Sequence, residues 1–259
     1  MASTPAFRND VIVRGGGPNE NRFYIDNVEI PYLNHFSTQG ASGGPIGILN
    51  VNFNVGLYFQ LPSYTALGYS SNTGVFLNKD NKLKYIQSDH LVAGLELIPT
   101  ENIQVTIEGF YKNYSKYPFS VKDQVPLSSK SAGYGIFGDE ELTSVSDGRA
   151  YGIELLGRLK EFKQTNLVFS YSFVRSEFKD LNSVWIPSSW DNRHLFNITA
   201  TRKFNRNWDL GFKWRFVGGA PYTPYDLEKS ALKAAWDLQG QGYIDYSRFN
   251  SERLKAFQG

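Results

Sequence analysis

The stretch Trp208-Asp-Leu-Gly-Phe-Lys-Trp-Arg-Phe216 alternates between apolar and polar or small side chains along its whole length. Successive side chains of a β-strand point to opposite faces, so a period of two is typical of a strand whose two faces meet different surroundings. The apolar face carries Leu210, Phe212, Trp214 and Phe216. We expect Lys213 and Arg215 on the other face.

The same alternation recurs upstream, at residues 51–60, 91–97, 103–108, 151–160, 167–173 and 196–201. With the stretch above, this makes seven candidate strands. Each is close to the length of about 9–11 residues that a tilted strand needs to cross a bilayer. The pattern therefore predicts an all-β, antiparallel architecture.

Composition removes several classes of protein. The 259 residues carry a net charge of only +2, which gives no support for a general nucleic-acid binder. The absence of Cys excludes disulfides and thiolate metal sites, and three scattered His make no metal-ligand spacing. Mean hydropathy is −0.38, and no apolar run is long enough for a helical span. A transmembrane β-barrel passes this test, because its apolar surface is hidden in alternation.

The connections between the candidate strands alternate in length. Short turns are expected at residues 99–101, 163–165 and 205–207, and long polar stretches at 61–84, 116–148, 178–192 and from 219 onward. This favours an outer-membrane barrel, whose two ends face different compartments, over a soluble β-sandwich. Several aromatic residues near strand ends would suit the interfacial girdles of such a barrel. They are Tyr114, Tyr117, Phe119, Tyr171, Trp208 and Trp214.

Residues 1–50 differ in character from the rest. They contain a glycine run at 15–17, a Gly-rich tract at 40–45, and short strand candidates at Val11–Val13 and Phe23–Ile25, with a turn signal at Asp26–Asn27. This segment is too short to bury a core of its own. We expect it to pack in the lumen of the barrel.

Several motifs resemble those of TonB-dependent outer-membrane receptors, in the forms seen in Bacteroidetes-type bacteria. In the first fifty residues they are Asp10-Val-Ile-Val-Arg-Gly-Gly-Gly17, Phe23-Tyr-Ile-Asp-Asn-Val-Glu-Ile-Pro31 and Asn34-His-Phe36, which are similar to the family's plug domain. Later motifs are similar to its distal barrel. They include Gln60-Leu-Pro-Ser-Tyr64, His90-Leu-Val-Ala-Gly-Leu-Glu96, Ser189-Trp-Asp-Asn-Arg-His194 and Gly219-Ala-Pro-Tyr-Thr-Pro224.

The resemblance implies two parts: a partial α/β plug segment at 1–50 and a portion of the β-barrel with long extracellular loops at 51–259. The family's export signal, its TonB-contacting box and the first part of its plug are not found in the chain. The seven candidate strands are also fewer than a barrel of about 22 strands needs. We therefore expect a partial plug joined to a late part of the barrel.

The resemblance also implies a function, namely energy-coupled import across the cell outer membrane with no chemistry on the ligand and no cofactor. Its partners would be outer-membrane lipid, an extracellular ligand of the siderophore, glycan or peptide class, and the TonB complex through a region that the chain lacks. A surface lipoprotein partner stays open, and no nucleic acid is expected. Two alternatives remain: an adhesin or assembly component on the same fold, and an enzyme. Against the enzyme, Asp89-His90 and Asp191-Asn-Arg-His194 have no nucleophile-elbow context.

Candidate ligand-binding residues fall in two groups. The resemblance places Asn34, His35 and Phe36 in an apical plug loop that faces the ligand; the alternative is that they only cap the plug. Aromatic residues in the long loops suit a bulky amphipathic ligand, although packing between loops explains them equally well. They are Tyr64, Tyr69, Trp185, Trp190, Tyr222 and Tyr225. Arg14 and Asp26 are expected to anchor the plug, and no residue is expected to hold a metal.

Overall fold

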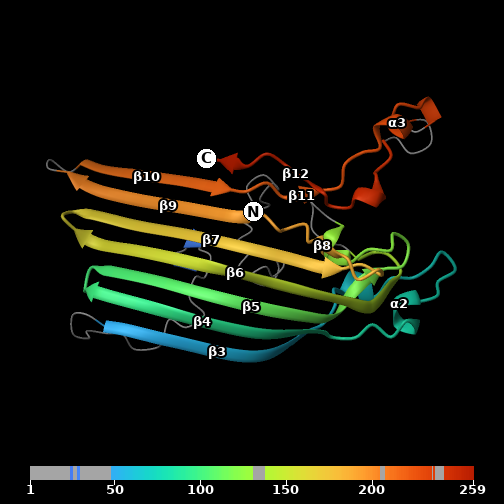
Figure 1. The fold of residues 1–259 in the computed structure, drawn as a ribbon, viewed down its shortest axis with the longest axis horizontal. Coiled ribbons are helices and arrows are strands. Elements are labelled where there is room, and N and C mark those ends of the chain that lie inside the picture. Colours follow the sequence, from blue (N-terminus) through green and yellow to red (C-terminus); the bar gives the residue numbers. More distant parts are fainter. Residues whose placement is uncertain are drawn as a thin grey trace.

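The computed structural model of the chain describes residues 24–25, 28–29, 48–130, 138–204, 208–234, 236 and 242–259. Seven long antiparallel strands follow one another as a meander in one sheet (Figure 1). This confirms the predicted all-β fold and the predicted strands. The long strands are β3 (Ile48–Gln60), β4 (Ile86–Thr100), β5 (Ile103–Ser120), β6 (Leu142–Phe162), β7 (Thr165–Lys179), β9 (Arg193–Phe204) and β10 (Trp208–Val217).

Short elements accompany the sheet. β8 (Trp185–Pro187) pairs with β7, and β13 (Phe257–Gln258) pairs with the end of β10. Two small two-stranded sheets are separate from this sheet: β1 (Tyr24–Ile25) with β2 (Val28–Glu29), and β11 (Pro221–Tyr222) with β12 (Glu252–Arg253). The helices are α1 (Tyr64–Leu67), α2 (Leu77–Asp80) and α3 (Leu227–Ser230), with 3-10 turns η3 (Leu127–Ser129) and η4 (Tyr246–Arg248). None of the helices in the described part of the chain is long and apolar enough to cross a membrane.

The connections alternate in length as predicted. At one end, the short-turn end, β4 joins β5 through residues 101–102 and β6 joins β7 through Lys163 and Gln164. Both of these residues have a positive φ, 47° and 63°, as a two-residue hairpin turn matched to strand twist requires. The third expected turn, 205–207, lies outside the described residues, although Phe204 pairs with Trp208 beside it. At the opposite, long-loop end, β5 extends to Ser120 and β6 begins at Leu142, so part of the expected loop at 116–148 is strand.

The register separates the two faces of the sheet. Residues paired directly across neighbouring strands lie on the same face. One such row crosses all seven strands and reads Val51, Leu95, Ile107, Leu155, Tyr171, Phe196 and Phe216. The row one position away reads Asn50, Glu96, Thr106, Leu156, Ser170, Asn197 and Arg215. The predicted split of the last strand is therefore confirmed, because its aromatic side chains share the apolar face.

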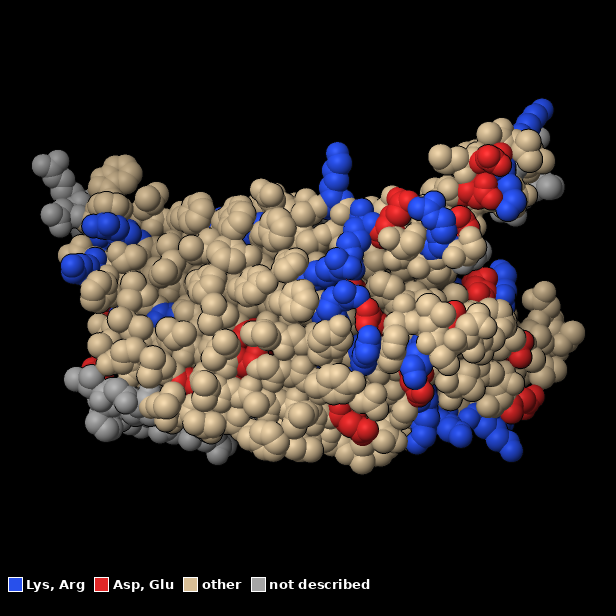
Figure 2. Space-filling model, in the orientation of Figure 1, with Lys and Arg blue, Asp and Glu red and all other residues tan. Residues whose placement is uncertain are grey.

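The apolar face is open rather than covered. Val51 and Phe53 in β3 are 72% and 71% exposed. Leu210 and Phe212 in β10, toward the other edge of the sheet, are exposed on the same face. In the space-filling view the middle of the sheet is largely free of charge, and charged side chains gather toward the ends (Figure 2). An exposed apolar surface that spans every strand is not expected of a protein surrounded by water, but it suits contact with lipid.

The opposite, inner face is buried near the long-loop end. Tyr114, Phe178 and Trp190 form a cluster there with Ile86 and Ala150. Phe178 lies on Gly148 of the neighbouring strand, where an added Cβ would be 2.3 Å from its ring. The expectation that Tyr114, Tyr117 and Phe119 join an interfacial girdle is wrong.

The three residues misassigned to a girdle belong to the inner packing. Tyr114 shares the face of its partners Ser88 and Gly148, Tyr117 packs on the same cluster, and Phe119 is only 3% exposed. The other expected girdle residues, Tyr171, Trp208 and Trp214, lie on the apolar face. The error arose because β5 continues past the membrane region, where its aromatics meet folded loops instead of lipid.

Candidate functional site at the long-loop end

Four segments meet at the long-loop end: loop A (61–85), loop B (121–141), loop C (180–192) and the final segment (218–259). Loops A and B are held together by the amide of Asn78, which is fully buried. Its Nδ2 donates to the carbonyl oxygens of Ala66 at 2.6 Å and Glu140 at 2.8 Å, and its Oδ1 accepts from the backbone N–H of Leu142 at 2.7 Å. A single side chain thus bonds to three backbone groups from two loops and the start of β6.

A second buried amide joins the remaining segments. Asn250, in the final segment, donates from Nδ2 to the carbonyl oxygens of Ser129 in loop B and Pro187 in loop C, both at 2.8 Å. Loops B and C also meet directly, where the backbone N–H of Ser189 donates to the Ser128 carbonyl at 3.0 Å. The long-loop end is therefore one connected layer in the described residues, although its parts are far apart in sequence.

Asp191 is the third buried link and the only one of the three that carries charge. It is fully buried, and its Oδ1 accepts from the backbone N–H of Ser176 at 2.8 Å. Its Oδ2 accepts from the guanidinium of Arg253, which also donates to the Gly219 carbonyl at 3.0 Å. Asp191 thereby joins loop C and the final segment to β7, as a hydrogen-bonding group at the rim rather than a catalytic acid.

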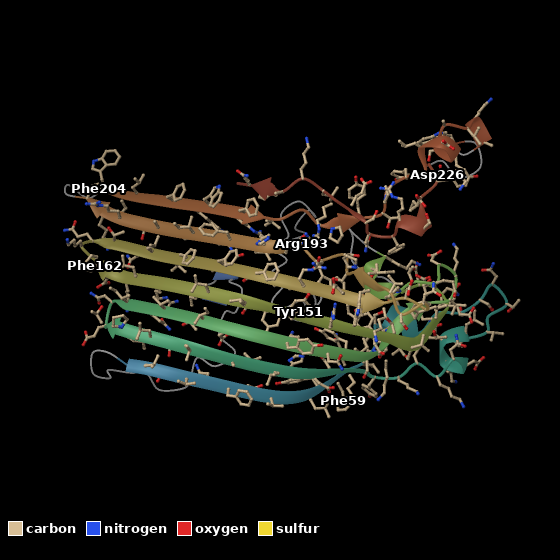
Figure 3. All side chains as sticks on the ribbon, viewed as in Figure 1. Phe59, Tyr151, Phe162, Arg193, Phe204 and Asp226 are labelled. Carbon is tan, nitrogen blue, oxygen red and sulfur yellow. The ribbon has the colours of Figure 1, made fainter. Side chains whose placement is uncertain are left out.

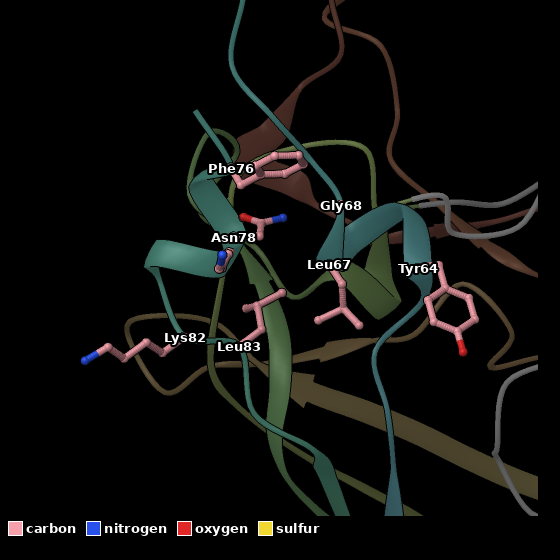
Figure 4. Close-up of a pocket in the computed structure, with 8 residues that line it drawn as sticks. Tyr64, Leu67, Gly68, Phe76, Asn78, Lys82 and Leu83 are labelled. Atoms are coloured by element: carbon pink, nitrogen blue, oxygen red, sulfur yellow. The ribbon is translucent and has the colours of Figure 1, made fainter. Parts of the chain in front are cut away.

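Loop A carries an open hollow of about 560 Å³ between α1 and α2. Figure 4 shows Tyr64 and Leu67 on one side of it, and Phe76, Lys82 and Leu83 on the other. Tyr64 is 84% exposed. The hollow combines aromatic and aliphatic walls with the cationic side chains of Lys79 and Lys82 at its margin. Such a lining can hold an amphipathic or anionic molecule.

Ion pairs and hydrogen bonds to carboxylates connect residues within loop B and within the final segment. In loop B, burial lowers the pKa of Lys130, but its hydrogen bonds with Asp123 and Glu140 outweigh this and leave the pKa raised. The Lys130 Nζ lies 2.6 Å from the nearer Glu140 oxygen. In the final segment, the Tyr222 hydroxyl donates to Glu252 at 2.7 Å, which raises the pKa of Tyr222 and lowers that of Glu252. Arg248 also donates to Glu252.

The predicted ligand-binding aromatics do not form one site. Tyr64 lines the hollow in loop A, and Tyr225 is half exposed in the final segment. Trp185 lies under two cations, with Arg149 4.1 Å and Lys179 5.0 Å from its ring centre. Trp190 is only 8% exposed within the inner cluster, so packing between segments accounts for it. Tyr69 is partly buried, and the hydroxyl of Tyr222 already donates a hydrogen bond to Glu252.

The remaining predicted residues, Asn34, His35, Phe36, Arg14 and Asp26, lie outside the described residues. Sequence reasoning missed Asn78 and Asn250, because a buried asparagine in a polar loop carries no local pattern that distinguishes it from an exposed one.

The acid–histidine pairs do not assemble a catalytic group. His90 Nε2 is 2.7 Å from Ser88 Oγ, and both side chains lie on the inner face. Asp89 lies on the opposite face, because it is the residue between them in the strand. Among the residues described, no group of three or more His, Asp or Glu could hold a metal ion.

Comparison with known proteins gives a family match and matches to solved structures. The family model described as "TonB dependent receptor-like, beta-barrel" matches residues 36–257. Among solved structures, the copper transporter OprC is 16% identical, with a TM-score of 0.50 over 81% of this chain and 27% of that one. The closed form of the ferric-catecholate import receptor Fiu from E. coli K12 is 12% identical, with a TM-score of 0.49 over 67% of this chain and 23% of that one. The chain thus spans about a quarter of the length of these proteins. No curated protein matches it.

Proposed function

We propose a function for this chain, which belongs to the TonB-dependent receptor-like β-barrel family. It forms part of the barrel wall and of the extracellular ligand-binding face of a receptor that imports a bulky ligand. The family places the chain in the outer membrane and among receptors rather than enzymes. One observation carries the proposal: a continuous apolar face ends at a layer in which all the long loops are tied together.

The dimensions of the apolar face support a transmembrane wall. Figure 3 places Phe162 and Phe204 at the short-turn end, and Tyr151 and Phe59 toward the long-loop end. From Tyr151 to Phe162 the strand β6 covers about 36 Å at about 3.3 Å per residue. At a tilt of about 40° this becomes about 28 Å, close to the apolar band of about 25 Å between two aromatic girdles.

The asymmetry of the two ends supports a receptor. Only the long-loop end has enough chain to build a surface, and Asn78, Asp191 and Asn250 hold that surface together. A layer that is ordered before a ligand arrives loses less conformational entropy on binding. The hollow beside Tyr64, with Lys79 and Lys82 at its margin, supports a ligand of amphipathic character in the siderophore, glycan or peptide class.

The plug resemblance of the first fifty residues supports import rather than passive flow. We propose that residues 1–50 contribute to a plug within the barrel, with Arg14 and Asp26 as its anchors and Asn34, His35 and Phe36 toward the ligand. Opening such a plug requires work, which the family obtains from the TonB complex.

The test uses the full-length parent protein in cells with and without TonB. Uptake of labelled ferric siderophores, oligosaccharides and peptides should depend on TonB for one of these classes. Replacing residues 64–83 by a short Gly-Ser linker should abolish binding of that class and leave barrel insertion intact. The matched control places the same linker in the short turn at 101–102, which should leave binding unchanged. Equal uptake without TonB would replace import by passive flow.

A further inference from the structure

Five cationic side chains gather where β6, β7, loop C and the final segment meet. We call them the rim cluster: Arg149, Arg175, Lys179, Arg193 and Arg253. Arg175 pairs with Tyr151 across β6 and β7, and Arg149 pairs with Glu177. Since Tyr151 belongs to the apolar face, the side chains of Arg149 and Arg175 lie on the lipid-facing side, Arg175 opposite Tyr151 and Arg149 one pair beyond it. Figure 2 shows Lys and Arg gathered at this border.

The two carboxylates within the cluster are already engaged. Glu177 Oε2 accepts from Arg149 Nε at 3.1 Å and Nη2 at 2.9 Å, and its Oε1 accepts from Arg175. Asp191 accepts from Arg253 and from backbone, as described above. Five cations therefore face two carboxylates that are nearly inaccessible to solvent and one exposed carboxylate, Asp147, two residues from Arg149 on β6. The charge that the cluster presents outward is positive.

The guanidinium groups of the rim cluster are held in place but can still donate hydrogen bonds to a ligand. Arg149 lies 4.1 Å above the ring of Trp185, which fixes its plane. Arg193 is 43% exposed, and its Nε is 4.0 Å from Asp191, which is longer than a hydrogen bond. Arg149 and Arg193 are connected through Glu177, Arg175 and Asp191, and such a set of guanidinium groups suits an oxyanion, because guanidinium N–H groups match phosphate oxygens in pairs.

The other half of the same rim carries less of this charge. The row of paired residues that contains Arg149 continues to Asn113, Asp89 and Leu57 on β5, β4 and β3. No cation stands in that half of the row. The positive charge is therefore concentrated on β6, β7, the start of β9 and the final segment, although Lys116 of β5 also lies at this end of the sheet, beside Gln87.

We propose that the rim cluster binds the phosphate of a glycolipid in the outer leaflet of the membrane. The cluster lies directly above the apolar face, at the level where lipid headgroups meet the protein. The apolar side chains below it, from Tyr151 and Phe173 downward, can pack along the acyl chains of the same molecule. A lipid-anchored phosphate uses both surfaces, whereas free phosphate uses only the cluster. The proposal depends on the membrane position of the sheet and not on import.

The experiment measures how much bisphosphorylated lipid A stays bound to the purified full-length protein, by native mass spectrometry. The double variant Arg149→Gln with Arg193→Gln should lower occupancy about tenfold, because two cations near an anionic headgroup are lost. The matched control changes Lys163→Gln and Arg202→Gln, which lie over Phe162 and Phe204 near the short-turn end. It should change occupancy by less than about twofold, since these cations meet the other leaflet.

Two further measurements keep the proposal open to contradiction. Heat-modifiable gel mobility tests whether each variant folds. If the double variant does not fold, the single variant Arg193→Gln replaces it. This variant removes only a half-exposed guanidinium group and should still lower lipid A occupancy. Dephosphorylated lipid A should bind weakly to every variant. Unchanged occupancy in Arg193→Gln, equal binding of dephosphorylated lipid, or displacement by inorganic phosphate alone would overturn the proposal.

Discussion

The strands and the long-loop end of this molecule are stabilised in different ways. Along the strands, the same register and the same alternation repeat seven times, so each residue contributes a small part. At the long-loop end, three buried side chains, Asn78, Asp191 and Asn250, join segments that are up to 121 positions apart in sequence. We therefore expect the strands to lose stability only when a polar or charged residue enters the apolar face. Each loop, in contrast, should lose its order when one of the three buried contacts is removed.

The largest effect is expected at Asp191. Asp191→Ala removes a buried carboxylate and leaves Arg253 and Arg175 facing each other without it, which should cost about 3–5 kcal/mol locally. Hydrogen exchange should rise in loop C and the final segment, while β3–β5 stay protected. Asp89→Ala, which removes an exposed carboxylate, is the control and should change little. Faster exchange in the strands would show that the two regions are not separable.

The next effect concerns the apolar face. Phe212→Arg should cost about 2–4 kcal/mol if the residue lies near the midplane of the bilayer, because the charge is placed in lipid. Barrel insertion into vesicles and guanidinium unfolding measure this cost. Lys213→Arg, one position along on the other face, is the matched control and should be neutral. Equal tolerance at both positions would refute the lipid-facing assignment.

A smaller effect is expected at Asn78. Asn78→Ala leaves two carbonyl oxygens and one N–H buried without this partner, at a cost of about 1–3 kcal/mol. The hollow in loop A should lose its order, seen as faster exchange in loops A and B, with no change in loop C. The control is Asn182→Ala, at an exposed position. If loop C loosened equally, the long-loop end would be a single cooperative unit.

The smallest effect is the pH dependence of the final segment. Hydrogen bonds from Tyr222 and Arg248 lower the pKa of Glu252 below its usual 4.5. A lowered pKa in the folded state adds stability that is present above pH 4.5 and is lost as the pH falls through the folded value. Exchange at β11 and β12 should therefore increase in acid. In Tyr222→Phe this increase should shrink, and an unchanged acid response would assign it to another group.

Much of the strand region was predictable because its signal is local. Strand positions, the split between Phe212 and Lys213 and the alternation of short and long connections all follow from a period of two and from polar interruptions. The girdle assignment of Tyr114 failed for an equally local reason. Nothing near Tyr114 in the sequence shows that β5 runs on beyond the membrane and that loops fold against its inner face.

The candidate site was predictable only in part. Aromatic residues in polar loops were visible, but their surroundings were not. Trp190 packs against Phe178, Trp185 lies under Arg149, and Tyr64 stands in the open. Each has the same kind of neighbours in sequence. Whether such a residue faces solvent depends on segments that approach it from elsewhere in the chain.

The sequence by itself determined which residues form strands and which side of each strand is apolar, because both depend on the geometry of one strand and its contact with lipid. Only the tertiary structure decided how the long-loop end is built. Buried amides and carboxylates act there on backbone groups from distant segments, and the free energy of each contact depends on burial that no single segment provides. The rim cluster has the same origin: its five cations come from four segments, and their combined charge exists only where those segments meet.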